Sequence, residues 1–154
     1  MNLFRYFKVA CIVLFAFSCS EEKKESSIFD LMESGATGLS FNNKLTPLPD
    51  LNMLKYMYFY NGAGVGAGDF NNDGLVDLFF AGNQVKNRLY LNTGNLKFRD
   101  VTEQAGIPDD KGWSTGVSVV DINQDGFLDI YVCRVGNYAS LQNHNLLLIC
   151  KGLD

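Results

Sequence analysis

Residues 69–77 read DFNNDGLVD, and residues 121–129, 52 positions further along, read DINQDGFLD. Both stretches carry Asp or Asn side chains at positions 1, 3, 5 and 9 and a glycine at position 6. Oxygen-bearing side chains that alternate around a glycine turn are typical of a tight loop that holds a cation. Because the stretch occurs twice in a chain of 154 residues, the sequence also indicates an internal repeat, and this repeat decides the fold.

The two copies match over more than the acidic stretch. The segments that align are residues 64–65 with 116–117 (both GV), 78–80 with 130–132 (LFF and IYV), and 87–94 with 145–152. The second copy carries six extra residues within 134–144. A period of about 50 residues is typical of solenoids, propellers and arrays, in which each repeat is one supersecondary unit.

Each copy is expected to form short strands separated by turns. In the first copy, strands are predicted at residues 64–70, 75–81, 88–92 and 96–101. Four strands per period are what a β-propeller blade contains. The second copy reaches Asp154 before its fourth strand. The sequence therefore predicts an all-β fold of calcium-binding β-propeller blades, about two in number with the second incomplete, which is not a closed propeller.

Three further elements are expected outside these strands. They are a helical turn at Ile28–Glu33, a strand at Tyr56–Tyr60 where Tyr alternates with Met57 and Phe59, and a brief helical turn at 102–106. The predicted organisation is then a signal peptide (1–18), a lipidated Cys with its tether (19–35), a segment leading into a strand (36–61), a first repeat (62–112) and an incomplete second repeat (113–154).

The N-terminus has the pattern of an export signal. Arg5 and Lys8 precede a nine-residue apolar run, Val9–Phe17, which is too short to span a bilayer as a helix but is typical of a signal peptide. Residues 16–19 (AFSC) resemble the lipobox of bacterial lipoproteins, although Ala stands where Leu is usual and Phe17 is bulky. The resemblance implies lipidation at Cys19, and an ordinary cleaved signal is the alternative. Residues 20–25 (SEEKKE) resemble the tether of surface-exported, Bacteroidetes-type lipoproteins, which implies an outer-membrane or cell-surface location.

Charge and cysteine content restrict the partners. Without residues 1–18 the chain keeps 11 Lys and Arg against 17 Asp and Glu, so its net charge falls from −4 to −6. This balance argues against nucleic-acid binding and against electrostatic membrane binding, which leaves the lipid as the expected membrane anchor. Cys133 and Cys150 remain in the folded part. An exported compartment would let them form a disulfide, but two separate strand residues are the favoured interpretation.

The acidic stretches carry a full set of oxygen ligands. Counting Asp69 and Asp121 as position 1, the expected metal ligands are the side chains at positions 1, 3, 5 and 9 and the main-chain carbonyl at position 7: Asp69, Asn71, Asp73, Leu75 and Asp77 in the first copy, and Asp121, Asn123, Asp125, Phe127 and Asp129 in the second. Flexible all-oxygen coordination favours Ca²⁺ over Mg²⁺, so two calcium sites are predicted. An EF-hand would need a Glu at position 12, where Phe80 and Val132 stand. A hairpin turn without a metal is the remaining alternative.

The stretches GVGAGDFNNDGLVDLFFAGN, NRLYLNTGNLKFRDVTEQAGI and GWSTGVSVVDINQDGFLDIYVCRVGN together resemble the FG-GAP/VCBS repeats of bacterial surface lipoproteins, which often carry an ASPIC/UnbV domain. The calcium-binding hairpins of integrin α-subunit propellers are distantly similar. The resemblance covers residues from about 36 onward and implies a calcium-dependent β-propeller, usually of seven blades, in a longer chain. Gly66 and Gly68 depart from it, because bulkier strand residues are common there.

The resemblance implies a structural or recognition role at the cell surface, toward a glycan or a protein, rather than catalysis. Two alternatives are a part of a propeller-based extracellular enzyme such as a polysaccharide lyase, and nucleic-acid binding, which has been attached by name to related sequences. His144, the single histidine, is expected to be solvated in the extra loop of the second copy. Trp113 is expected to pack between blades, with sugar stacking as the alternative.

Overall fold

The computed structural model describes residues 27–110, 112–138 and 140–152. The signal peptide and Cys19 lie outside these residues. The chain divides into two compact units, Met1–Leu31 and Met32–Asp154. In the described part of the first unit, residues 27–31 are exposed and form no regular element. Across the described residues, no helix combines the length and the apolar character that a membrane crossing requires.

The first repeat forms a four-stranded antiparallel sheet in the order β1-β2-β3-β4. Its strands are β1 (Val65–Gly68), β2 (Asp77–Phe80), β3 (Arg88–Asn92) and β4 (Phe98–Asp100). All four predicted strands are confirmed, with each end shorter by one or two residues except at β3, whose bounds agree. The expected turn at 102–106 is present as a turn rather than a helix, and Gly106 ends it with a φ of 67°.

The second repeat forms a three-stranded antiparallel sheet in the order β5-β6-β7. Its strands are β5 (Ser114–Val120), β6 (Asp129–Arg134) and β7 (Leu146–Leu148). The fold of the described residues is therefore nearly all β, with two open sheets and no closed barrel or propeller. The short helix α2 (Ser34–Thr37) precedes them.

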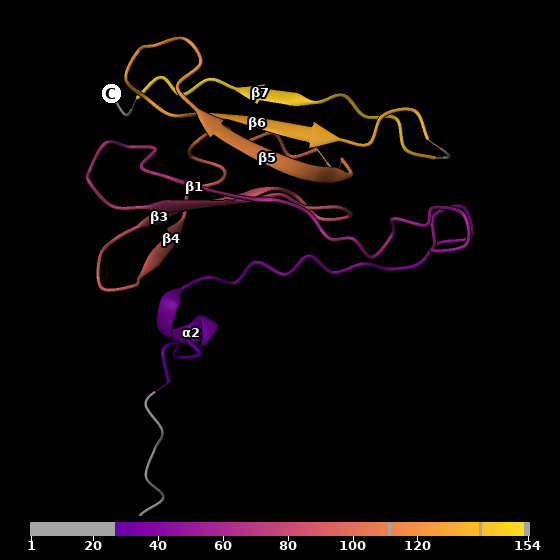
Figure 1. Cartoon of the computed structure of the whole chain (residues 1–154), viewed down its shortest axis with the longest axis horizontal. Coiled ribbons are helices and arrows are strands. Elements are labelled where there is room, and N and C mark those ends of the chain that lie inside the picture. Colours follow the sequence, from indigo (N-terminus) through magenta and orange to yellow (C-terminus); the bar gives the residue numbers. More distant parts are fainter. Residues whose placement is uncertain (1–26, 111, 139, 153–154) are drawn as a thin grey trace, which may run out of the picture. The chain divides into compact units, whose positions relative to one another are not determined.

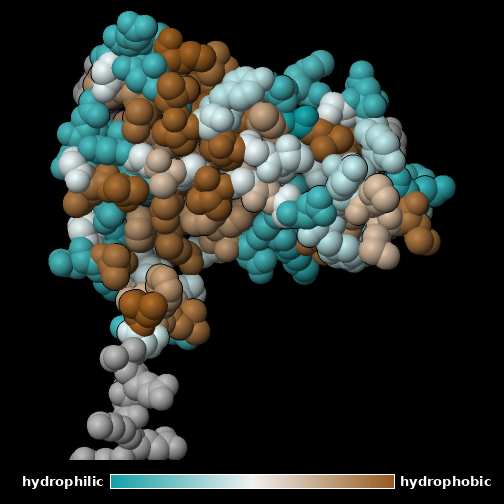
Figure 2. Space-filling view, viewed as in Figure 1, coloured by the Kyte–Doolittle hydropathy of each residue, from teal (hydrophilic) through white to brown (hydrophobic). Residues whose placement is uncertain are grey.

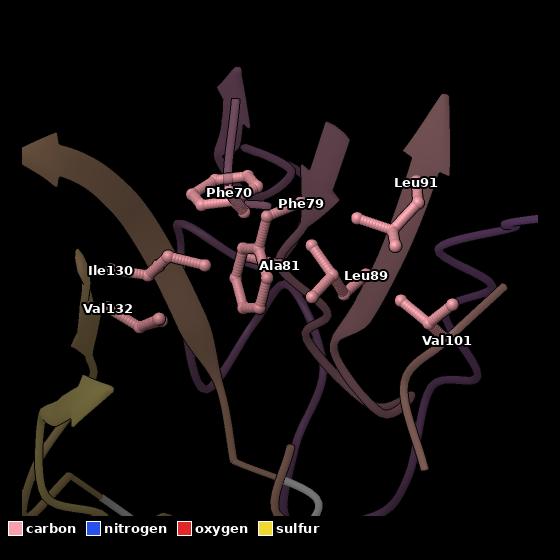
Figure 3. Close-up of a cluster of buried hydrophobic side chains, with 8 residues drawn as sticks. All are labelled: Phe70, Phe79, Ala81, Leu89, Leu91, Val101, Ile130 and Val132. Atoms are coloured by element: carbon pink, nitrogen blue, oxygen red, sulfur yellow. The ribbon is translucent and has the colours of Figure 1, made fainter. Parts of the chain in front are cut away.

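The two sheets stack face to face, with β1 beside β5 (Figure 1). The core between them contains eight buried hydrophobic residues, which come from both repeats: Phe70, Phe79, Ala81, Leu89, Leu91, Val101, Ile130 and Val132. Ile130 and Val132 point from the second sheet toward the aromatic side chains of the first (Figure 3). Burial of this shared face is the main force that holds the repeats together.

The glycines that depart from the FG-GAP/VCBS pattern have a packing role. A Cβ atom added to Gly66 would lie 2.8 Å from side-chain atoms of both Val117 and Val119, and one added to Gly68 would lie 2.7 Å from Leu128 Cδ1. The absence of side chains on β1 therefore makes room for the bulky side chains of the second sheet.

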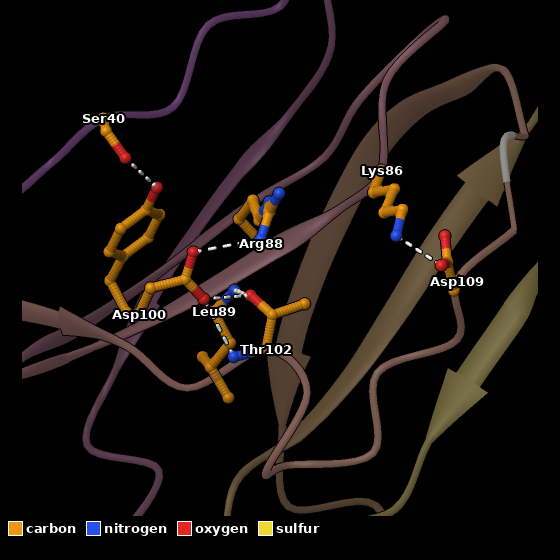
Figure 4. Close-up of polar contacts among 8 residues, drawn as sticks. Ser40, Lys86, Arg88, Leu89, Asp100, Thr102 and Asp109 are labelled. Carbon is orange, nitrogen blue, oxygen red and sulfur yellow. Dashed lines mark hydrogen bonds and ion pairs between the residues drawn. The ribbon is translucent and has the colours of Figure 1, made fainter.

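A polar network ties the outer side of the first sheet together (Figure 4). Asp100 pairs with Arg88 at 3.1 Å and accepts the Thr102 hydroxyl at 2.6 Å, while Thr102 Oγ1 accepts the backbone N–H of Leu89 at 3.0 Å. Lys86 pairs with Asp109 in the connection to the second repeat. These contacts hold β4 and the inter-repeat connection against β3.

The strand predicted at Tyr56–Tyr60 is wrong. Residues 57–60 form turns, in which the Phe59 N–H donates to the Tyr56 carbonyl and the Asn61 N–H donates to the Tyr58 carbonyl. Tyr56 and Phe59 are buried, whereas Tyr58 and Tyr60 are exposed. The two buried side chains are therefore three residues apart, a spacing that fits a turn. In a strand the buried side chains would be two residues apart, so the alternation of Tyr residues does not reflect a strand.

The buried aromatic residues of this segment pack on Trp113. Tyr56 and Phe59 have ring centroids 5.4 and 5.3 Å from the Trp113 ring, and Trp113 is 2% exposed. Leu141, from the extra loop of the second copy, completes the cluster. Trp113 is thus a core residue that joins residues 51–59 to the second repeat, and its buried ring presents no sugar-stacking surface.

The helical turn predicted at Ile28–Glu33 is also wrong. The helix α2 begins after Glu33, and the described residues before it are irregular. Ile28, Phe29 and Leu31 are each at least 85% exposed. With its apolar side chains exposed, the turn that their spacing predicted lacks the burial that would stabilise it.

Candidate metal centre

The two acidic loops have the same backbone conformation. Each connects the first and second strands of its sheet, β1 to β2 and β5 to β6. At position 4, Asn72 and Gln124 have φ values of 57° and 62°, and at position 6, Gly74 and Gly126 have φ values of 85° and 92°. Glycine adopts this left-handed conformation without the steric cost that other residues incur. The glycine at position 6 is therefore required by the turn in both copies.

Positions 1, 3 and 5 are linked to one another within each loop. In the first loop, Asp69 Oδ1 accepts the N–H of Asp73 at 3.1 Å, and Asp69 Oδ2 accepts the N–H of Gly74 at 2.7 Å. Asn71 Nδ2 donates to Asp73 Oδ2 at 2.9 Å, and Asp73 Oδ1 accepts the N–H of Leu75 at 2.8 Å. Three of the predicted ligand side chains thus lie around one turn of the chain.

The second loop repeats these four hydrogen bonds with its equivalent atoms. Asp121 accepts the N–H groups of Asp125 and Gly126 at 3.1 and 2.9 Å, Asn123 donates to Asp125 at 2.7 Å, and Asp125 accepts the N–H of Phe127 at 2.9 Å. Each distance agrees with its counterpart in the first loop within 0.2 Å. The two sequences therefore specify one and the same local structure.

The carboxylate at position 9 has a different environment, because it is buried in the sheet. Asp77 is 0% exposed; its Oδ2 accepts the N–H of Phe70 at 3.0 Å and its Oδ1 accepts the N–H of Asn92 at 2.7 Å. It thereby ties the ends of β1 and β3 to the start of β2. Asp129, 1% exposed, makes the equivalent bonds to the N–H groups of Ile122 and Cys150 at 3.0 and 2.8 Å.

Burial and neighbouring negative charge raise the pKa of the Asp77 carboxyl group. Desolvation raises the pKa of its carboxyl group above the ordinary value of 3.8, and the negative charges of Asp73 and Asp69 raise it further. The N–H groups of Asn92 and Phe70 act in the opposite direction and lower the pKa, but burial is the larger effect. The raised pKa means that burial, together with the neighbouring carboxylates, disfavours the ionised form of Asp77.

The two loops contact each other across the repeats. Asn72 Nδ2, at position 4 of the first loop, donates a hydrogen bond to the carbonyl oxygen of Gly126 in the second loop, at 3.1 Å. Sequence reasoning did not find this contact. Asn at position 4 is a signal only for the left-handed turn, which Asn tolerates well, and not for a bond to a residue 54 positions away.

The donor set fits a hard cation at positions 1, 3 and 5. These side chains carry carboxylate and amide oxygens at exposed or half-buried positions, and an oxygen that accepts one hydrogen bond keeps a further lone pair. The carbonyl oxygens at position 7, of Leu75 and Phe127, accept no hydrogen bond among the described residues. Asp77 and Asp129 would share oxygens that already accept backbone N–H groups.

No three Asp, Glu, His or Cys side chains of the described residues form a ready-made metal-binding group. Each loop instead combines two carboxylates and an amide near the surface with one carboxylate in the sheet. The ten predicted site residues are therefore brought together in two equivalent sets of five, in each of which position 9 is set apart by its burial.

Other predicted features lie away from the loops or near their rims. His144 is exposed. Cys133 and Cys150 are free thiols, as the favoured interpretation of two separate residues expects, but only Cys133 lies in a strand, β6, whereas Cys150 lies beyond the end of β7. A band of hydrophobic residues crosses the two stacked sheets (Figure 2). A cavity of about 500 Å³ is lined by Leu89, Leu91 and Val101 from the first repeat and by Ile149 and Cys150 from the second. Asn71 also lines this cavity, at the rim of the first acidic loop.

Comparison with known proteins identifies a known repeat in the residues that form the two loops. The family model for the FG-GAP-like repeat matches residues 69–132, from position 1 of the first loop to the middle of β6. Cartilage acidic protein 1 of Mus musculus is 35% identical over 69 residues, which are 45% of this chain and 11% of that protein. Cartilage acidic protein 1 of Xenopus tropicalis is 31% identical over 81 residues, 53% of this chain and 12% of that protein. The chain thus spans about a tenth of the length of these relatives.

Proposed function

We propose that this chain is a calcium-binding, β-propeller-type segment of an exported lipoprotein, and that it serves structural and recognition roles toward a glycan or protein at the cell surface. An FG-GAP-like repeat covers both acidic loops. The observation that carries the proposal is the repetition of the loop geometry, because four hydrogen bonds recur in both loops within 0.2 Å. A calcium ion would supply positive charge to a loop whose carboxylates otherwise repel one another.

The residues of each loop have separate tasks in this proposal. The side chains at positions 1, 3 and 5 and the carbonyl at position 7 would hold the ion, since their oxygens are near the surface. The carboxylate at position 9 holds the loop on the sheet, because Asp77 and Asp129 each bind two backbone N–H groups. Occupied loops would then stiffen the hairpins β1–β2 and β5–β6.

The recognition role is supported by an exposed aromatic segment at residues 53–60. Met57 is 74% exposed, Tyr58 is 55% exposed and Tyr60 is 63% exposed. Tyr and Met are enriched at protein interfaces because they offer large contact area. Tyr56 and Phe59 of this segment pack with Trp113 in a buried cluster, and this packing fixes the position of the exposed side chains beside them.

The test is thermal unfolding of the chain with calcium, with magnesium and with EDTA. Calcium should raise the melting temperature, EDTA should remove the increase, and magnesium at the same concentration should raise it less. Asp73→Ala and Asp125→Ala should each reduce the increase, whereas Leu54→Ala, at a 92% exposed side chain outside both loops, should leave it unchanged. Equal melting temperatures in calcium and EDTA would contradict the proposal. Lipidation is tested separately, by fatty-acid labelling that should be lost in Cys19→Ser.

A further inference from the structure

Three pairs in the sequence place an Asn or Asp directly before a glycine: Asn61–Gly62, Asp73–Gly74 and Asp125–Gly126. Such a pair can react with itself, because a glycine without a side chain lets its backbone nitrogen approach the side-chain carbonyl carbon of the preceding residue closely. The product of this attack is a five-membered succinimide ring. The hydrogen bonds that hold the side chain and the glycine N–H therefore decide which pair reacts in the folded chain.

The two pairs in the acidic loops are held by hydrogen bonds on both sides. In the first loop, the N–H of Gly74 donates to Asp69 Oδ2 at 2.7 Å, and the Asp73 carboxylate accepts a backbone N–H at 2.8 Å. The second loop repeats both bonds, each at 2.9 Å. Both bonds must break before the ring can form in either loop.

The pair Asn61–Gly62 is not held in this way. Asn61 is exposed, and neither its side chain nor the N–H of Gly62 makes a hydrogen bond among the described residues. Gly62 has a φ of 79°, and a Cβ atom placed on it would have no heavy atom within 4 Å. Around this open site the backbone is fixed, because the Asn61 N–H donates to the Tyr58 carbonyl at 3.1 Å and the Gly62 carbonyl accepts Asn83 Nδ2 at 3.2 Å.

We propose that Asn61 is a site of spontaneous deamidation in the folded chain. The backbone nitrogen of Gly62 loses its proton to solvent and bonds to Cγ of Asn61. The bond from Cγ to the side-chain nitrogen breaks, and this nitrogen takes up a proton and leaves as ammonia. Water then opens the ring at either of its carbonyl groups, which gives aspartate or isoaspartate at position 61. The net change is the loss of NH and the gain of O, with no oxidation or reduction.

The modification changes the exposed aromatic segment at residues 53–60. Lys55 is the single charged residue between positions 51 and 62, so the new carboxylate brings the first negative charge into this stretch. It stands directly after Tyr60, whose side chain is 63% exposed. Isoaspartate also directs the main chain through Cγ, which adds a carbon atom to the backbone before the Gly62 carbonyl that Asn83 holds. This proposal does not depend on whether the acidic loops bind calcium.

Peptide mapping by mass spectrometry tests the proposal on the 154-residue chain, incubated in mildly alkaline buffer with EDTA. Electron-transfer fragmentation distinguishes aspartate from isoaspartate at each of the three pairs. A second sample in denaturant gives the rate of each pair without structure, and circular dichroism confirms that the first sample stays folded. In the folded chain, Asn61 should convert at a rate comparable to its rate in denaturant. Asp73 and Asp125 should isomerise on the order of tenfold more slowly than in denaturant, because hydrogen bonds must break first.

Asn61→Gln is the matched variant, because its longer side chain would have to form a six-membered ring, which closes far more slowly. It should remove the conversion at position 61 and leave the melting temperature unchanged. The proposal would be overturned if Asn61 stayed intact in the folded chain while it converted in denaturant. It would also be overturned if folding slowed the reaction of Asn61 as much as those of Asp73 and Asp125. The rate at Asn61 should be the same in calcium as in EDTA, so a failure of the calcium assignment would leave this test unaffected.

Discussion

Asn72 in the first acidic loop donates a hydrogen bond from Nδ2 to the carbonyl oxygen of Gly126 in the second loop, at 3.1 Å. Gly126 is the position-6 glycine of its loop, and its N–H donates to Asp121 at 2.9 Å. One peptide segment of the second loop therefore contacts both its own position-1 carboxylate and the neighbouring repeat. This bond is a direct link between the two loops, through which they would be coupled.

Asn72→Ala should weaken the coupling between the loops without removing either set of ligands. Because the bond is exposed, its loss should lower the free energy of unfolding by only about 0.5–1.5 kcal/mol. Calcium titration followed by calorimetry should show two binding events that are more independent than in the wild type. The matched control is Gln124→Ala, the equivalent position in the second loop. Equal changes in the two variants would contradict a specific role for the Asn72 bond.

Asp77→Ala and Asp73→Ala should separate folding from ion binding. Asp77→Ala leaves the buried N–H groups of Phe70 and Asn92 without an acceptor, and each unsatisfied group costs about 1–3 kcal/mol. Asp73 is exposed, so Asp73→Ala should change the calcium-free stability little and chiefly lower calcium affinity. Chemical denaturation in EDTA measures the first effect and calcium titration the second. Comparable losses of calcium-free stability in both variants would show that position 9 has no special structural role.

The raised pKa of Asp77 predicts how stability depends on pH in calcium-free buffer. A group whose pKa is higher in the folded state binds its proton more tightly there, so its contribution to stability is present below the ordinary value of 3.8 and is lost as the pH rises through the folded pKa. Acidification from neutral pH should therefore stabilise the calcium-free chain through this group, and Asp77→Asn should lack that contribution.

Calcium should reverse this pH dependence, because the positive charge of an ion held by Asp69 and Asp73 favours the ionised form of the neighbouring Asp77 carboxyl group. The increase in melting temperature that calcium produces should shrink as the pH falls through the folded pKa of Asp77. Asp110, whose pKa is lowered by its hydrogen bond to Arg134, loses its contribution only below 3.8 and thus acts in a different pH range. A calcium effect that grows on acidification would contradict the prediction.

Gly64→Ala should destabilise the stacked sheets, whereas Gly116→Ala at the equivalent position of the second repeat should not. A Cβ atom on Gly64 would lie 2.8 Å from the backbone nitrogen of Val117, but one on Gly116 would have Cys133 Cβ as its nearest neighbour, at 3.8 Å. Overpacking of this kind costs about 1–3 kcal/mol. Thermal unfolding of the two variants compares the same substitution in two environments, and equal melting temperatures would show that the sheets do not stack as described.

The sequence predicted the repeat and its strands well, since both depend on short-range patterns. Arg88–Asn92 is a strand with the predicted bounds because a short apolar run, Leu89–Leu91, is flanked by turn residues on both sides. Tyr56–Tyr60 failed because its alternation was incidental: Trp113, more than 50 residues away, selects Tyr56 and Phe59 as the buried pair. A partner so distant in the chain leaves no trace in the local spacing of the residues that it buries.

The composition of the candidate site was also predictable, but the environment of each residue was not. Alternating oxygens around a glycine give the five positions of each loop. The separation of Asp77 from Asp69 and Asp73 depends on the N–H of Asn92, which the hairpin β2–β3 brings into place. The contact between Asn72 and Gly126 requires the two sheets to stack. Both are tertiary effects, which the sequence of each nine-residue stretch does not encode.

Isothermal titration calorimetry with calcium most directly tests the central claim that the two acidic loops hold two ions. The wild-type chain should bind two calcium ions, Asp73→Ala and Asp125→Ala should each bind one, and the double variant should bind none. Circular dichroism confirms that the variants keep their strands. Two ions bound by the double variant, or none bound by the folded wild-type chain, would contradict the assignment of calcium to these loops.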